Sequence, residues 1–186
     1  MNNQLYLDIL KANPDKINWN LLSTNPVAIE MLEENPDKIN WFYLSSNPAA
    51  IHLLEANLSK IDWDMLCKNP AAIHLLEANQ HKINWDMLCK NPAAIHLINT
   101  NLDKINSNKI NCYCLSSNPA AIELLEENPD KIDWYTLSSN PAEIHLINEM
   151  LKTNPHKINW DHFCSGNRIY YYLKYMTQNN SEYILK

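Results

Sequence analysis

The feature that most constrains this chain is a tryptophan that returns at a fixed interval. Four of these residues are each 22 positions apart: Trp19, Trp41, Trp63 and Trp85. The series then continues with spacings of 27, 22 and 26, at Cys112, Trp134 and Trp160. A fixed internal period of this size is typical of solenoids and other repeat arrays. The sequence therefore predicts about seven copies of one short unit.

Residues 41–62, WFYLSSNPAAIHLLEANLSKID, show the unit clearly. Asn47 is a preferred helix N-cap, and Pro48 suits the first helical position because it has no N–H to satisfy there. The apolar residues that follow are spaced three and four apart, which predicts a helix with one buried stripe: Ala50, Ile51, Leu53 and Leu54. Asn57 suits a left-handed position that ends this helix. The pattern predicts one long helix per unit.

A second, shorter helix of mixed α and 3-10 character is expected around each tryptophan. Its N-caps are expected at Asn18, Asn40, Asp62, Asn84, Asp133 and Asn159. The tryptophan and the leucine three residues later should face the core together. Neither helix is long enough to be stable alone in water, so neighbouring units must supply the stability. The predicted fold is an all-α solenoid, or superhelix, of two-helix repeats.

The repeat predicts a single domain over residues 1–186, with atypical ends. Residues 1–18 read as an N-terminal half repeat, 19–159 as six repeats and 160–186 as a tyrosine-rich C-terminal cap. Two interruptions are expected to be tolerated. The string KINSNKIN near residue 105 lengthens a turn, and four residues near 150 add about one turn to a helix.

Leucine-rich repeats are the rival architecture, because their units have a similar length. Leu44-Ser45-Ser46-Asn47 matches the end of their consensus. A strand in that position requires an apolar residue two places before the leucine. Polar residues predominate there instead: Asn20, Phe42, Asp64, Asp86, Tyr113 and Tyr135. The helical prediction is therefore preferred.

The string WxxLSxNPxAIxLLxxNPxKI resembles the short Trp/Asn-Pro repeats of uncharacterised proteins from giant DNA viruses of the mimivirus kind. The resemblance covers roughly residues 5–165. The unit is also similar to the leucine-rich variant repeat, whose alternating α and 3-10 helices form a right-handed superhelix. This chain departs from that pattern in its tryptophan and in its Lys-Ile step. Both resemblances imply repeat scaffolds and carry no catalytic motif.

Composition limits the class of protein further. The formal net charge is −6, which argues against a protein that coats duplex nucleic acid through excess Lys and Arg. No apolar run approaches the length of a membrane span, and residues 1–4 have no signal-peptide character. The five cysteines are an odd number without metal-type clustering, so an intracellular location is expected (host cytoplasm or virion, if the source is viral).

Equivalent positions of successive repeats are expected to form columns on the surface. One column, called here the acid–imidazole column, is the candidate interaction surface: Glu30, His52, His74, His96, Glu123 and His145. Such residues can bind a metal or respond to pH. Because neighbouring helices lie about 8–10 Å apart, shared metal ligation is disfavoured and a solvated or partner-contacting face is preferred.

A second column, the lysine column, is the alternative site, since it offers a track for phosphates: Lys38, Lys60, Lys82, Lys104, Lys131 and Lys157, preceded by Lys16. Glutamates at a nearby position of the unit suggest Lys–Glu pairing between repeats as the simpler account. Nucleic-acid binding along this column therefore stays the second hypothesis.

A third column alternates Ser and Cys, including Ser45, Cys67 and Cys89, which is typical of a small buried position rather than of a nucleophile. The pair Cys112 and Cys114 is only a weak metal or redox signal, because no second pair accompanies it. We therefore expect a non-enzymatic scaffold that binds a protein partner or serves a structural role. No catalytic residue, metal, cofactor, small-molecule substrate or membrane contact is expected.

Overall fold

The fold is described from a computed structural model that places residues 3–105 and 109–137, together with positions 140, 142, 146, 160 and 161. Every regular element in this part of the chain is an α-helix or a 3-10 helix. The strand that a leucine-rich repeat requires is absent from these residues. None of the described helices is long and apolar enough to cross a membrane.

The contacts divide the chain into two compact units, Met1–Leu97 and Ile98–Lys186. The boundary falls a few residues before the lengthened turn that the sequence predicts near residue 105. Unit 1 holds the regular 22-residue repeats, and unit 2 holds the irregular ones.

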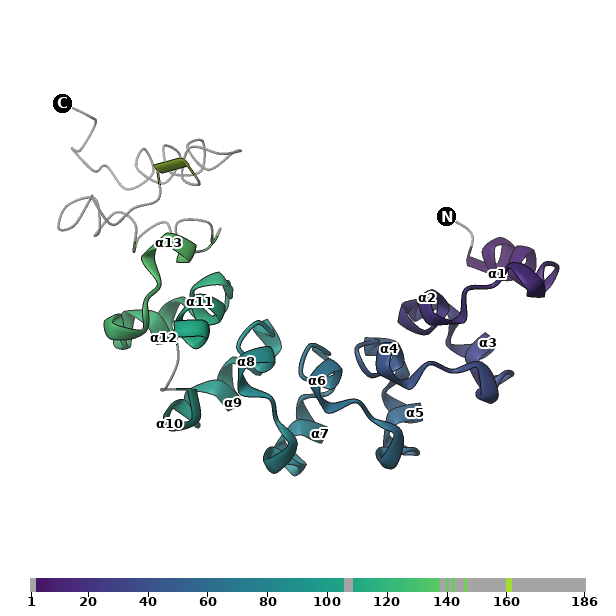
Figure 1. Ribbon diagram of the computed structural model, residues 1–186, viewed down its shortest axis with the longest axis horizontal. Coiled ribbons are helices and arrows are strands. Elements are labelled where there is room, and N and C mark those ends of the chain that lie inside the picture. The colour runs from purple at the N-terminus through teal and green to yellow at the C-terminus, as the bar shows by residue number, and fades with distance from the viewer. Residues whose placement is uncertain are drawn as a thin grey trace. The chain divides into compact units, whose positions relative to one another are not determined.

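Unit 1 begins with α1 (Asn3–Lys11), and two kinds of helix then alternate. Four helices begin at a repeat tryptophan and are called here the Trp-led helices: α2 (Trp19–Thr24), α4 (Trp41–Ser45), α6 (Trp63–Leu66) and α8 (Trp85–Leu88). The second kind comprises α3 (Ile29–Glu33), α5 (Ile51–Glu55) and α7 (Ile73–Ala78), and α9 (Ile95–Asn99) lies at the boundary. Figure 1 shows the two kinds in two rows, and α2 contacts α4 as α4 contacts α6.

The prediction of one long α-helix per repeat is wrong in its detail, because this helix begins as a 3-10 turn. Before α3, α5 and α9 lie η2 (Pro26–Ala28), η4 (Pro48–Ala50) and η7 (Pro92–Ala94). Asn47 Oδ1 accepts a hydrogen bond from the Ala49 N–H at 3.0 Å, and Ala50 N–H donates to the Asn47 carbonyl at 3.1 Å. These short-range bonds tighten the first turn, and the α-helix continues for only five or six residues.

The second helix is α-helical, and the 3-10 turns that the sequence assigned to it lie before it: η1 (Pro14–Lys16), η3 (Pro36–Lys38), η5 (Leu58–Lys60) and η6 (Gln80–Lys82). The predicted N-caps are confirmed at five positions, where the side-chain oxygen accepts from the backbone N–H three residues later: Asn18, Asn40, Asp62, Asn84 and Asp133. The sixth predicted cap, Asn159, lies outside the described residues.

The asparagines that follow α3, α5, α7 and their equivalents do not adopt the predicted left-handed conformation. Asn57 has φ −137°, and its counterparts have φ between −130° and −133°. The side chain ends the helix instead, because the Asn57 amide donates to the Leu53 carbonyl at 2.9 Å. The asparagine side-chain amide thus satisfies a carbonyl at the helix end. The backbone therefore does not need a positive φ, which is unfavourable for a residue with a β-carbon.

The core consists of small and aliphatic side chains rather than of the tryptophans. Three columns are fully buried in unit 1: the leucines Leu44, Leu66 and Leu88; the alanines Ala28, Ala50, Ala72 and Ala94; and the leucines Leu32, Leu54 and Leu76. The described tryptophans of unit 1 are only half-buried, which corrects the prediction that they face the core.

Unit 2 contains α10 (Leu102–Ile105), α11 (Lys109–Ser117), α12 (Ile122–Glu127), η8 (Pro129–Lys131) and α13 (Trp134–Leu137). Helix α11 takes the place of a Trp-led helix and contacts α13. It starts three residues before half-buried Cys112, the residue that replaces tryptophan. The helix extension near 150 and the predicted cap at 160–186 lie outside the described residues, apart from single positions.

Candidate functional site

Several junctions between neighbouring repeats, among the described residues, are joined by equivalent buried polar groups. Ser45 Oγ donates to the Trp41 carbonyl at 2.7 Å and accepts from the Asp62 N–H at 3.0 Å, so one hydroxyl joins two repeats. Ser23 makes the same pair of bonds one repeat earlier, to Trp19 and Asn40. In unit 2, Ser116 Oγ accepts from the Asp133 N–H at 2.9 Å.

A buried asparagine completes the junction. Asn69 is fully buried, and its amide donates to the Ser45 and Asn47 carbonyls at 3.0 Å each. Asn91 bonds to Cys67 and Asn69 in the same way, and Asn140 bonds to Ser116 and Asn118 in unit 2. The predicted structural role of these asparagines is confirmed. They cap their own helix and also hold the preceding repeat, which the sequence pattern did not predict.

Cysteines replace the junction serine in two repeats of unit 1. Cys67 and Cys89 are not in disulfide bonds and are fully buried. Burial raises the pKa of the Cys67 thiol to about 11, although a hydrogen bond from the Asn84 backbone opposes this shift. A nucleophilic or redox-active cysteine requires the opposite, a lowered pKa and access to solvent. The interpretation of this column as a packing position agrees with this geometry.

Cys67→Ser is expected to leave stability at pH 7 nearly unchanged, because serine occupies the same position in neighbouring repeats. The variant should differ from the parent at high pH. A pKa raised from 9.0 to about 11 in the folded state contributes stability that is complete below pH 9 and lost as pH rises through about 11. At pH 10 the alkaline loss should therefore be smaller in Cys67→Ser by roughly 1 kcal/mol. Urea unfolding at pH 7 and pH 10 measures it, and an equal loss in both proteins would contradict the prediction.

The acid–imidazole column pairs with glutamates of the preceding repeat. His52 Nε2 lies 2.6 Å from Glu33 Oε1, and His74 Nε2 lies 2.9 Å from Glu55 Oε1. All four side chains are about half exposed. Glu30, His96 and Glu123 are exposed on the equivalent helices, and His145 lies outside the described residues. Among the described residues, no three such side chains converge as metal ligands.

Two lysines of the lysine column lie over tryptophan rings. Lys60 Nζ lies 4.7 Å from the centre of the Trp41 ring, and Lys82 Nζ lies 4.4 Å from that of Trp63. These are cation–π distances, and each pair joins positions 19 residues apart. The predicted Lys–Glu pairing does not describe these two residues. Lys104 and Lys131 lie on the described surface, and Lys157 lies outside the described residues.

Earlier in the chain, lysines of this column pair with the aspartate beside them. Lys16 Nζ lies 3.3 Å from Asp15, and Lys38 Nζ lies 3.1 Å from Asp37. The hydrogen bond from Lys38 lowers the pKa of the Asp37 carboxyl. Positive and negative side chains therefore alternate along this part of the column.

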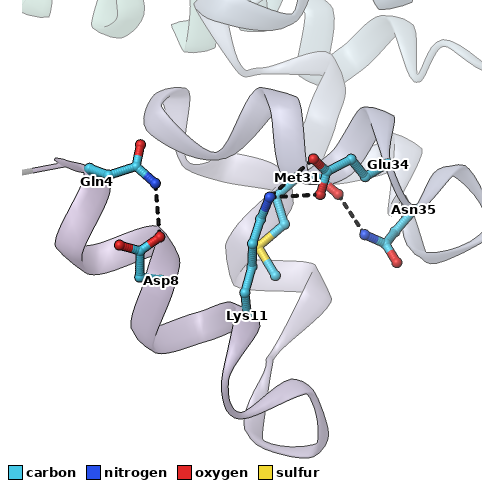
Figure 2. A network of polar contacts seen from close by, with 6 residues as sticks. All are labelled: Gln4, Asp8, Lys11, Met31, Glu34 and Asn35. Carbon is cyan, nitrogen blue, oxygen red and sulfur yellow. Dashed lines mark hydrogen bonds and ion pairs between the residues drawn. The ribbon is translucent and has the colours of Figure 1, made fainter.

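Helix α1 is attached to the first full repeat by an ion pair (Figure 2). Lys11 Nζ lies 2.9 Å from Glu34 Oε2, and the hydrogen bond to Glu34 raises the pKa of this lysine. Asn35, next to Glu34, donates to the Met31 carbonyl at 2.9 Å, and Gln4 donates to Asp8 within α1 at 2.8 Å. Both side chains of the ion pair are about half exposed, so the pair orients α1 more than it stabilises it.

A group of exposed apolar residues was missed by the sequence reasoning. It lies on the helices that begin at a repeat tryptophan or take the place of one. Leu21, Phe42, Tyr113 and Tyr135 are between 48% and 64% exposed. Phe42 packs edge-on against the Tyr43 ring at 5.1 Å between centroids. The sequence signal for three of them is an aromatic residue directly after the repeat tryptophan or the cysteine that replaces it, a position that is Asn or Asp in the other repeats. Leu21 lies two positions after Trp19 and has no such signal.

Comparison of the chain with family models, curated proteins and solved structures found no match.

Proposed function

We propose that this chain is a non-enzymatic repeat scaffold, arranged as an α-solenoid, that binds a protein partner through its Trp-led helices. The recurring junction carries the solenoid proposal. The same hydrogen bonds, at separations of 17, 22 and 24 residues, occur in unit 1 and again in unit 2. A junction whose backbone partners recur at these separations propagates one stacking geometry, which is how solenoids grow.

Exposed aromatic side chains support protein binding on this row. Phe42 projects beside half-buried Trp41, and in unit 2 Tyr113 and Tyr135 stand at the same repeat position as Phe42. Aromatic residues are enriched in protein–protein interfaces and often dominate their binding energy. On the other row, His52 and His74 are already engaged with Glu33 and Glu55. We therefore place the partner on the Trp-led row, and the acid–imidazole column stays a prediction.

Nucleic-acid binding is the second candidate, and the lysine column is its only specific support. Asp15 and Asp37 are paired with Lys16 and Lys38, and a phosphate would have to displace these carboxylates. The thiol chemistry offers little support for an enzyme, because burial raises the pKa of Cys67. The giant-virus resemblance and an intracellular location stay predictions.

Photo-crosslinking tests the proposed function. A benzophenone side chain at position 42 is expected to crosslink a discrete protein in an extract of the native host, and one at position 52 is not. Phe42→Asp, expected to fold because Phe42 is 48% exposed, should compete poorly for that partner, whereas His52→Ala should compete like the parent. Crosslinking from position 52 alone would contradict the choice of face.

A gel-shift assay over a salt series separates the two candidates. Single-stranded and duplex probes are expected to bind weakly and without dependence on the lysine column. If Lys60→Ala with Lys82→Ala lowers affinity and also the salt slope by about 2, those amines contact phosphates and the nucleic-acid candidate replaces the protein one.

A further inference from the structure

The lysines of the lysine column in unit 1 have two kinds of partner. Lys16 and Lys38 each pair with the aspartate directly before them, at 3.3 and 3.1 Å. Lys60 and Lys82 lie instead over the tryptophan ring of the preceding repeat, at 4.7 and 4.4 Å from its centre. Of these two arrangements, only the second joins one repeat to another.

The residue before each of these lysines differs in the same way. It is Asp15 or Asp37 where the lysine stays within its own repeat. It is Ser59 or His81 where the lysine lies over a tryptophan. Both Ser59 and His81 are exposed, and neither offers the neighbouring lysine a carboxylate. The two kinds of partner therefore follow the charge of one side chain.

Neither the spacing nor the backbone explains why Lys38 has a different partner. Trp19 precedes Lys38 by 19 residues, the same separation as in both cation–π pairs. The backbone leaves η3 and η5 along the same path, because Ile39 has φ −62° and ψ 123°, and Ile61 has φ −64° and ψ 128°. Among the described residues, however, no lysine lies over the Trp19 ring. The difference that remains beside the lysine is the carboxylate of Asp37.

The two arrangements are close in free energy. An ion pair between exposed side chains contributes little to stability, and a cation–π contact at an exposed site contributes about as much. The side chains of Lys38 and Asp37 are 51% and 71% exposed, so their ion pair belongs to the weak class. Because the two contacts are so nearly balanced, one carboxylate beside the lysine is enough to decide between them.

We infer that the residue before the lysine decides whether that lysine joins two repeats, which makes Ser59 a charge switch in unit 1. A negative group at position 59 draws Lys60 away from the Trp41 ring. A neutral group at position 37 releases Lys38 to Trp19. A phosphoryl group on exposed Ser59 carries more negative charge than a carboxylate and has the same effect. The switch acts on contacts within the chain and does not depend on the proposed protein partner.

The NMR signals of the lysine ε-methylene protons report which partner each lysine has, because an indole ring current shifts protons that lie over its face upfield. In the parent chain, Lys60 and Lys82 should show this upfield shift and Lys38 should not. Ser59→Asp should remove the shift from Lys60 and leave it on Lys82, and phosphoserine at position 59 should do the same. Asp37→Asn, which changes the charge but keeps the side-chain size and the preceding proline, should produce the shift on Lys38.

A double-mutant cycle of Lys60→Ala and Trp41→Ala measures the contact itself. In the parent chain, the coupling between the two changes should be about two- to fivefold in the equilibrium constant of unfolding. The coupling should disappear in the Ser59→Asp background. Ser59→Asn is the matched neutral control, and it should keep the coupling of the parent. Position 59 is exposed, so both backgrounds are expected to fold.

Three results would each overturn the inference. The first is an upfield shift that stays on Lys60 in Ser59→Asp. The second is the absence of that shift from Lys38 in Asp37→Asn, since spacing or backbone would then separate the two lysines. The third is an equal coupling in Ser59→Asp and Ser59→Asn. Crosslinking from position 42 tests the proposed function in a chain with Ser59 unchanged, so either conclusion can fail without the other.

Discussion

Asn69→Leu is expected to lower the free energy of unfolding by roughly 3–5 kcal/mol, because three hydrogen bonds of a fully buried side chain are lost together. The amide donates to the Ser45 and Asn47 carbonyls, and its oxygen accepts from the Ala71 N–H at 3.0 Å. Leucine matches the volume but leaves the carbonyl of buried Ser45 without this partner and removes the cap on the Ala71 N–H. Urea unfolding followed by circular dichroism measures the loss.

Asn57→Ala is the matched control for Asn69→Leu. Asn57 also ends in an amide that donates to a backbone carbonyl, that of Leu53, but it is only half-buried and its bond stays within one repeat. Its replacement should cost about 1 kcal/mol. Asn69→Asp should cost at least as much as Asn69→Leu, because a carboxylate would face two carbonyl oxygens. Equal losses for Asn57→Ala and Asn69→Leu would show that the bonds between repeats add nothing beyond a local cap.

The contrast between these asparagines shows how far the sequence predicts the fold. The Asn-Pro step that follows a Trp-led helix predicts a helix start, because the cap bond joins residues two apart in the chain, such as Asn47 and Ala49. The bond from Asn69 to Ser45 spans 24 residues, and it exists only after two repeats have packed. Local chemistry was therefore predictable, whereas the groups that meet across a junction were not.

The surface columns illustrate the same limit. Sequence alignment within the chain separates lysines, glutamates, histidines and tryptophans correctly into columns. It does not predict which columns meet, because the offset of 19 residues that brings Lys60 to Trp41 and His52 to Glu33 depends on how the helices stack. Opposite charge led to the prediction that Lys pairs with Glu between repeats. In the structure, His52 and His74 occupy the positions that meet the glutamates. The same limit applies to the candidate binding surface. The exposure of Phe42 depends on which side of α4 is buried, and the sequence does not predict that side.

Leu54→Ala should cost about 3 kcal/mol in free energy of unfolding, and Trp63→Ala should cost less, about 2 kcal/mol, although tryptophan is the larger residue. Leu54 is fully buried, so its removal leaves a cavity among side chains that cannot close it. Trp63 is half-buried, so part of its side chain already contacts water and its removal exposes less new apolar surface. If both variants unfold with the same loss, the tryptophan belongs to the core, as the repeat spacing alone predicts.

A double-mutant cycle then separates the two parts of the tryptophan's contribution. Lys82 Nζ lies 4.4 Å from the centre of the Trp63 ring, so Lys82→Ala should cost about 0.5–1 kcal/mol in the parent and almost nothing once Trp63 is alanine. Additive losses would mean that the contact between Lys82 and the Trp63 ring does not contribute to the free energy of unfolding. A positive coupling would explain why tryptophan recurs at a position that is not core: its inner edge packs on the repeat, and its face binds the lysine that begins the next one.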